Sequence, residues 1–211
     1  ELPEPAAVTV TADLVTLRLT RAGTPPSGWT ATADGTRWAH PRPRRNSDAP
    51  GTSPLPSLAT IGGTTEEPVY LNLEAAGVIS ITDDGDGQAI DLVRSVALEL
   101  AATPFAGPIN VVAHGIDIPG AHHHPHLRTT DSLTGALAEL ETEALAYQGL
   151  IDGGGVKSLF GERAANLTND GFPPTVLLTN DTSAAVDEVA RRLPSNAGVA
   201  LVVVGAIEAP A

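Results

Sequence analysis

Residues 77–90 (Gly-Val-Ile-Ser-Ile-Thr-Asp-Asp-Gly-Asp-Gly-Gln-Ala-Ile) join an apolar run, a turn with two glycines and the start of a helical pattern. This order is typical of a phosphate-binding loop, in which backbone N–H groups at a helix N-terminus bind an anion. Gly87, Gln88 and Ala89 stand where such a loop has Gly, Lys and Ser or Thr. Lys contacts the β and γ phosphates, and the hydroxyl holds magnesium. Gln88 and Ala89 supply neither group.

The same loop carries carboxylates at Asp83, Asp84 and Asp86, with Gly85 among them. Carboxylates repel phosphate, whereas an acidic side chain at a helix N-terminus is stabilised by the helix dipole. We therefore expect residues 83–89 to form a strand-to-helix turn with an acidic N-cap. In this interpretation the loop is vestigial and binds no nucleotide cofactor.

A second apolar run ends in polar residues at 176–181, Val-Leu-Leu-Thr-Asn-Asp. It has the form of a Walker B strand, which presents a magnesium-holding Asp and a water-activating Glu. Here Asn180 and Asp181 take those two places. Asn is an uncharged, weaker metal ligand, and Asp is one methylene shorter than Glu. This site is also predicted to be vestigial, so we expect no ATP hydrolysis.

Histidines cluster in residues 122–126, His-His-His-Pro-His. Imidazoles bind zinc, copper or nickel, so His122, His124 and His126 are weak candidates for metal ligands. Adjacent side chains of an extended chain point to opposite sides, which does not favour one closed tetrahedral site. The run is therefore interpreted as a solvated loop, and no metal cofactor is expected.

A glycine-rich stretch at residues 152–158, Asp-Gly-Gly-Gly-Val-Lys-Ser, contains Lys157, which is the only Lys in the chain. It follows a helical pattern rather than a strand, and Val156 occupies a place where a phosphate-binding loop requires Gly. We interpret it as a helix end followed by a turn.

Short apolar runs alternate with helical periodicity in the second part of the chain, which predicts an α/β fold. This Rossmann-like or RecA-like fold has a mostly parallel sheet with helices on both faces. Strands 77–82 and 175–179 are expected to be central because continuous apolar runs require burial on both sides. The predicted strands are 69–73, 77–82, 109–114, 175–179 and 199–205. The predicted helix faces include Ile90 to Leu100, Leu133 to Ala144 and Val186 to Leu193.

A small β unit is expected at the N-terminus. Residues 8–19 alternate apolar and polar side chains, and Asp34-Gly35 is a hairpin turn signal between short β-prone segments. Trp29 and Trp38 are predicted to be partly buried there. The chain divides into a β appendage at 1–40, a proline-rich tether at 41–60 and an α/β domain at 61–211.

The chain has 211 residues and a net charge of −13, of which residues 61–211 contribute −14. Such an acidic surface repels phosphate backbones, so nucleic-acid binding is not expected. The absence of Cys excludes disulfides and thiolate chemistry. No apolar run is long enough to span a membrane, so we expect no membrane contact by this segment and a cytoplasmic location.

Several segments carry a resemblance to known families. The order of strands, loops and helices resembles the motor domain of FtsK/SpoIIIE-type (RecA-type) ATPases. Four short sequences are similar to parts of a segment of large actinobacterial proteins with LysM and bacterial transcriptional activator domains. They are residues 69–77, 98–105, 136–141 and 172–176. The resemblance implies an ATPase-derived domain that has lost its catalytic groups. It also allows a parent protein that is associated with a membrane. It transfers no catalytic residue.

Two functional hypotheses follow. The favoured one is a non-catalytic module for assembly or regulation, whose partners are other domains of the parent protein or separate proteins. The alternative is a switch or enzyme that binds a nucleotide or divalent cation through carboxylates at the strand ends, which the sheet could gather at one edge. Those carboxylates belong to Asp83, Asp84, Asp86, Asp117 and Asp181.

Overall fold

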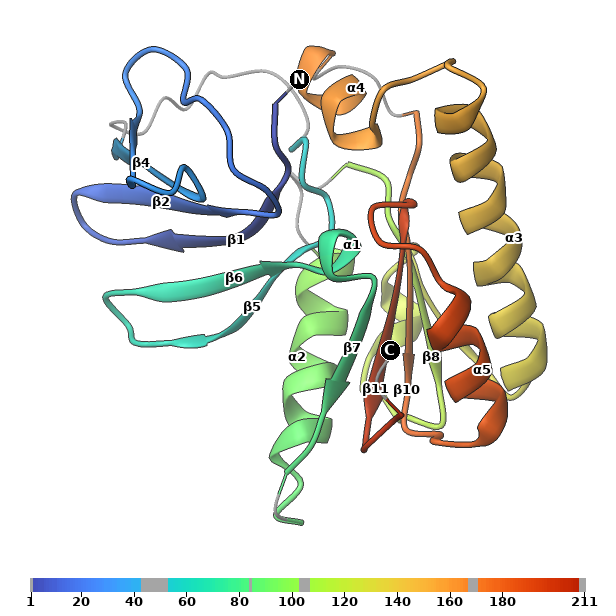
Figure 1. Ribbon diagram of the computed structural model, residues 1–211. Helices are drawn as coiled ribbons and strands as arrows, with labels where there is room; N and C mark the ends of the chain where they lie inside the picture. Colours follow the sequence, from blue (N-terminus) through green and yellow to red (C-terminus); the bar gives the residue numbers. More distant parts are fainter. Residues whose placement is uncertain (1, 43–52, 84, 103–106, 167–170, 209–211) are drawn as a thin grey trace.

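A computed structural model describes residues 2–42, 53–83, 85–102, 107–166 and 171–208 (Figure 1). The elements in chain order are β1 (Pro5–Val10), β2 (Leu14–Leu19), β3 (Thr30–Ala31), β4 (Arg37–Pro41), β5 (Leu58–Gly63), β6 (Pro68–Asn72), α1 (Leu73–Ala76), β7 (Val78–Ile81), α2 (Gln88–Ala102), β8 (Asn110–His114), the 3-10 helix η1 (Ala121–His123), β9 (Leu127–Thr130), α3 (Leu133–Asp152), α4 (Leu159–Ala165), β10 (Thr175–Thr179), α5 (Ala184–Arg192) and β11 (Val199–Val204). They form a six-stranded sheet in the order β3-β4-β2-β1-β6-β5 and a five-stranded sheet in the order β7-β11-β10-β8-β9.

The six-stranded sheet is antiparallel and contains the N-terminal strands expected from the sequence. The hairpin at Asp34-Gly35 is confirmed: Thr32 donates from Oγ1 to Asp34 Oδ1 at 2.6 Å, and Gly35 has a φ of 69°. Trp38 is buried and Trp29 is half-buried, with its ring centroid 5.0 Å from that of His40. Both tryptophans therefore anchor this sheet, as predicted.

The strand expected at residues 69–73 lies in this antiparallel sheet and not in the parallel one. It is β6, which pairs with β1 and with β5. A five-residue apolar run fits either kind of strand, so its pattern could not decide the sheet. The short helix α1 and Gly77, whose φ is 70°, then turn the chain into β7. Part of the predicted tether, residues 58–60, belongs to β5, and residues 43–52 lie outside the described part.

The five-stranded sheet is parallel throughout. Strand β10 is central and every residue in it is buried, as its sequence predicts. The prediction that residues 77–82 form a central strand is wrong, because β7 is an edge strand that pairs with β11. Its side chains are half-buried or exposed, so α2 and β11 give it less cover than a central strand has. Strand β9, Leu-Arg-Thr-Thr, was too short and polar to be predicted.

Helices cover both faces of the parallel sheet, which confirms the α/β expectation (Figure 1). Alternate residues of β10 point to opposite faces: Val176 and Leu178 pack with α2, and Leu177 packs with α3 and α5. Ser132 caps α3 by accepting a hydrogen bond from Gly135 N at 3.2 Å. No helix within the described ranges combines the length and apolarity that a membrane crossing requires.

Candidate functional site

The loop after β7 lies at the carboxyl edge of the parallel sheet and leads into the N-terminus of α2. Asp83 lies across this terminus: its carboxylate accepts hydrogen bonds from Ala89 N and Gly85 N, both at 2.9 Å. These bonds stabilise the ionised form and lower the pKa of Asp83. The acidic cap expected at this position is present, with Asp83 as the capping residue. Asp84 lies outside the described residues.

The remainder of this loop is held by its own side chains. Asp86 Oδ1 accepts from Gln88 N at 3.2 Å, and the Gln88 amide also donates to the other carboxylate oxygen of Asp86. Gly85 and Gly87 have φ values of 92° and 85°, so the turn uses the left-handed backbone that glycine favours. A hollow of about 540 Å³ beside the loop is lined by Asp83 and Asp86, without Lys or Arg among the lining residues described.

Strand order reverses between β8 and β10, the position where open α/β sheets bind ligands. His114 Nδ1 lies 3.2 Å from Thr179 Oγ1 at this point, and Thr179 is fully buried. Hydrogen bonds from Ser183, first from its side chain and second from its N–H at 2.8 Å, lower the pKa of Asp181. Its carboxylate therefore begins the turn into α5, while the adjacent Asn180 is exposed.

The acidic residues of the alternative hypothesis are distributed along this edge. Asp83 and Asp86 follow the edge strand β7, whereas Asp181 follows β10, with β11 between those strands. Asp117 is exposed in the loop after β8, and its carbonyl oxygen accepts from Arg94 Nε at 2.8 Å. Within the described ranges, no three His, Asp or Glu side chains are placed to hold one metal ion.

The histidine run forms η1 and the turn that follows it. The rings of His122 and His123 have centroids 3.9 Å apart. His122 and His126 are exposed, and His124 is half-buried. The three weak candidates therefore lie on a surface segment, and they are not gathered with carboxylates among the described residues.

The structure also contains a buried ion pair near the amino-terminal ends of the parallel strands, at the opposite side of the sheet from the loop after β7. Sequence reasoning missed this pair. Arg163 of α4 binds Glu74 of α1 through two hydrogen bonds of 2.9 and 3.0 Å, and their side chains are 7% and 3% exposed. Ser57 Oγ donates to Glu74 at 3.0 Å, and the carbonyl of Phe172 accepts from Arg163 at 2.7 Å. The pair joins segments 89 residues apart in the chain, so no local spacing identifies it.

Glu4 extends this polar cluster toward the N-terminal strand. Asn72 donates from Nδ2 to Glu4 at 3.1 Å and to the carbonyl of Pro5 at 2.9 Å. Burial, and next the nearby charge of Glu74, raise the pKa of Glu4 to about 7. This carboxyl therefore titrates near neutral pH, unlike an exposed Glu.

Comparison with known proteins gives structural likeness only. No family model and no curated protein matches the chain. The solved structures include the pCW3 conjugation coupling protein TcpA with ATPγS, at a TM-score of 0.51 and 9% identity, covering 96% of this chain and 71% of TcpA.

Two further structures have lower TM-scores. The cytoplasmic domain of the Thermomonospora curvata type VII secretion ATPase EccC matches at 0.48 and 21% identity, covering 77% of this chain and 22% of EccC. The cytoplasmic domain of EssC matches at 0.38 and 16% identity, covering 70% of this chain and 30% of EssC.

The likeness to TcpA establishes the class of fold. The chain has an α/β fold with a parallel five-stranded sheet, and its fold is similar to that of TcpA, which was solved with ATPγS. This agrees with the α/β fold, with a mostly parallel sheet and helices on both faces, that the sequence predicts.

Proposed function

We propose that the chain is a non-catalytic, ATPase-derived module that serves assembly or regulation within a larger bacterial protein. One observation carries this proposal: Asp83 accepts hydrogen bonds from Ala89 N and Gly85 N at the start of α2. In a working loop such N–H groups bind phosphate. Here a carboxylate of the chain already accepts from them, and its negative charge opposes an incoming phosphate.

The residue types at the two vestigial positions support the same proposal. Gln88, Ala89 and Asn180 replace the cation, the hydroxyl and the first carboxylate that ATP hydrolysis uses. Removal of one group that stabilises a transition state typically lowers the rate by about a hundredfold or more. Loss of three such groups, with Asp83 and Asp86 added beside them, favours a module without turnover.

The partners we propose are other domains of the parent protein or separate proteins, in the cytoplasm. The similarity to actinobacterial proteins with LysM and transcriptional activator domains supplies this context. The charge of −14 over residues 61–211 favours basic protein surfaces over nucleic acid as partners.

The alternative is a nucleotide- or cation-binding switch or enzyme at the same loop. The observation in its favour is the hollow of about 540 Å³ next to Asp83 and Gln88. A thermal-shift screen with ATP, magnesium, calcium and zinc addresses it, since a ligand of the native state raises the Tm.

Calorimetric titration with ATP and magnesium tests the proposal directly. We expect no saturable binding at micromolar ATP by the unmodified chain. The matched variants are Gln88→Lys with Ala89→Ser, which restores the cation and hydroxyl, and the same pair with Asp83→Ala, which removes the capping carboxylate. We expect the triple variant to bind better than the double variant. Saturable binding by the unmodified chain that the substitutions do not improve contradicts the proposal.

A further inference from the structure

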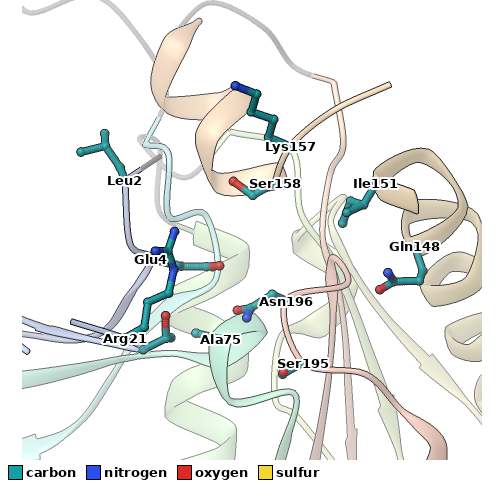
Figure 2. A pocket seen from close by; sticks show the side chains of 11 residues that line it. Leu2, Glu4, Arg21, Ala75, Gln148, Ile151, Lys157, Ser158, Ser195 and Asn196 are labelled. Atoms are coloured by element: carbon teal, nitrogen blue, oxygen red, sulfur yellow. The ribbon is translucent and has the colours of Figure 1, made fainter. Parts of the chain in front are cut away.

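A second cavity, of about 650 Å³, lies near the amino-terminal ends of the parallel strands, on the opposite side of the sheet from the vestigial loop. Figure 2 shows that its walls come from the N-terminal segment, α1, the end of α3, the start of α4 and the loop before β11. The polar cluster of Glu74 and Arg163 lies directly beneath it, since Glu4 and Asn196 belong to the cavity wall and both interact with Glu74.

The half-buried part of the wall presents hydrogen-bond acceptors. Glu4 carries a carboxylate of which one oxygen accepts from Asn72. Asn196 Oδ1 is buried and has no hydrogen-bond partner among the described residues. The Asn196 backbone is fixed by a φ of 60° and by its N–H, which donates to Glu74 O at 3.0 Å. An unsatisfied buried acceptor is costly, and the last side-chain torsion of Asn turns easily, so this amide favours a ligand with N–H groups.

The mouth of the cavity carries the opposite charge. Lys157 and Arg21 line it and are exposed. Lys157 is placed there by the glycine-rich turn after α3 and by Ser158, which caps α4 through Gly161 N at 3.0 Å. Ile151 and Ala75 add apolar surface to the wall. The wall thus combines the acceptors of Glu4 and Asn196 with two cationic side chains and some apolar surface. Figure 2 shows Lys157 toward the top of the view and Asn196 toward the bottom, on opposite sides of the cavity.

We propose that this cavity binds an amphoteric, amino-acid-type ligand, whose cationic N–H group meets Glu4 and Asn196 and whose carboxylate meets Lys157. A carboxylate that has lost part of its hydration gains from a cationic partner, and an anion at the mouth gains from the lysine. The apolar side chains of Ile151 and Ala75 accommodate the methylene groups of the ligand. This inference does not rest on the proposed function, because it concerns a cavity at the other edge of the sheet.

The ionisation of Glu4 gives the binding a pH dependence. Glu74 on α1 repels the charge of Glu4, Arg163 on α4 attracts it, and Asn72 donates a hydrogen bond to it, while Lys157 and Arg21 line the mouth. Because burial leads these effects and raises the pKa of Glu4 to about 7, the carboxylate is mainly ionised above pH 7. The affinity for a cationic group should therefore rise about tenfold between pH 6 and pH 8.

Titration calorimetry of the 211-residue chain with three probes tests the proposal. L-arginine carries both charges, agmatine lacks the carboxylate, and L-citrulline replaces the guanidinium with a neutral urea group. We expect L-arginine to bind at pH 8, agmatine to bind more weakly, and L-citrulline to bind at least about tenfold more weakly than L-arginine. Two results overturn the proposal. One is equal affinity for L-arginine and L-citrulline, and the other is no binding of any probe at a concentration on the order of 10 mM.

Two variants assign the ends of the ligand. Glu4→Gln keeps an acceptor for Asn72 and should abolish the rise in L-arginine affinity between pH 6 and pH 8. Lys157→Ala lies on the exposed mouth and should weaken L-arginine by about threefold or more without changing agmatine. A Glu4→Gln variant that keeps the pH dependence, or a Lys157→Ala variant that weakens both probes equally, contradicts the assignment. Circular dichroism of each variant verifies the fold.

Discussion

The buried ion pair between Glu74 and Arg163 gives the sharpest test of how the two sheets are held together. Arg163→Met removes the charge and the donors but keeps much of the volume of the side chain. It leaves Glu74, whose side chain is 3% exposed, without its cation. The carbonyl of Phe172 also loses a donor, since Arg163 reaches it at 2.7 Å.

The expected loss follows from the burial of both partners. Breaking a buried pair by removing one member costs about 3 to 5 kcal/mol, because the remaining charge is uncompensated. Domains are typically stable by about 5 to 15 kcal/mol, so Arg163→Met should remove a large fraction of the free energy of unfolding. Ser57 Oγ still donates to Glu74, which places the expected loss nearer the lower value.

Urea unfolding followed by circular dichroism measures this loss. The matched control is Arg191→Met, because Arg191 is paired with Glu188 and Glu208 on an exposed surface. Exposed pairs contribute little, so this control should leave the urea midpoint nearly unchanged. The double variant Glu74→Gln with Arg163→Met should be more stable than Arg163→Met alone, since it leaves no unpaired buried charge.

Two results would refute this reasoning. A loss below about 1 kcal/mol for Arg163→Met would mean that the pair is solvated rather than buried. A double variant that is less stable than Arg163→Met alone would mean that hydrogen bonding by Glu74, and not charge pairing, holds α1 and α4 together.

Three further predictions concern Glu4, Asp83 and Gly198. The pKa of Glu4 is raised to about 7, so the free energy of unfolding falls as the pH rises from about 4.5 to 7. In urea unfolding, Glu4→Gln should therefore stabilise the chain by up to about 3 kcal/mol at pH 8 and not at pH 4. Asp83→Ala should lower the Tm by about 2 to 4 °C in calorimetry through loss of the α2 cap, and Asp83→Asn should lower it less. Gly198→Ala should lower the free energy of unfolding in urea by about 2 kcal/mol, because Gly198 has a φ of 72° and an added Cβ would lie 2.7 Å from Tyr147 Cε2. The control Gly154→Ala should cost less, since Gly154 has a similar φ of 71° but open space around it.

The sequence predicted the elements whose burial is complete. Strand β10 and the helices α2, α3 and α5 have continuous or periodic apolar positions, and the structure places them in the core as expected. The Asp34-Gly35 hairpin was also predictable, because its turn chemistry is local. In each of these cases the sequence pattern that predicts the element lies within the residues of the element itself.

Strand order and sheet membership could not be predicted in the same way. The apolar patterns of β6 and β7 resemble those of buried strands, but β6 pairs with β1 in the antiparallel sheet and β7 lies at an edge. Pairing depends on contacts between segments far apart in the chain, which periodicity does not encode. The helix α4 was missed because it has seven residues and only one helical turn of apolar side chains.

The same distinction separates the two edges of the parallel sheet. The role of Asp83 was accessible from the sequence, because the capping carboxylate lies within six residues of the N–H group that it accepts from. Glu4, Glu74, Asn196 and Arg163 come together only through the fold, and charged or amide side chains scattered at such separations look like surface residues in a sequence. Burial gives them their properties. It raises the pKa of Glu4, it encloses the ion pair of Glu74 and Arg163, and it leaves Asn196 Oδ1 without a hydrogen-bond partner in the part of the chain that the structure describes. A polar cavity built in this way is visible only in the structure, and for that reason the motif pattern of the chain does not predict the site that we propose around Glu4.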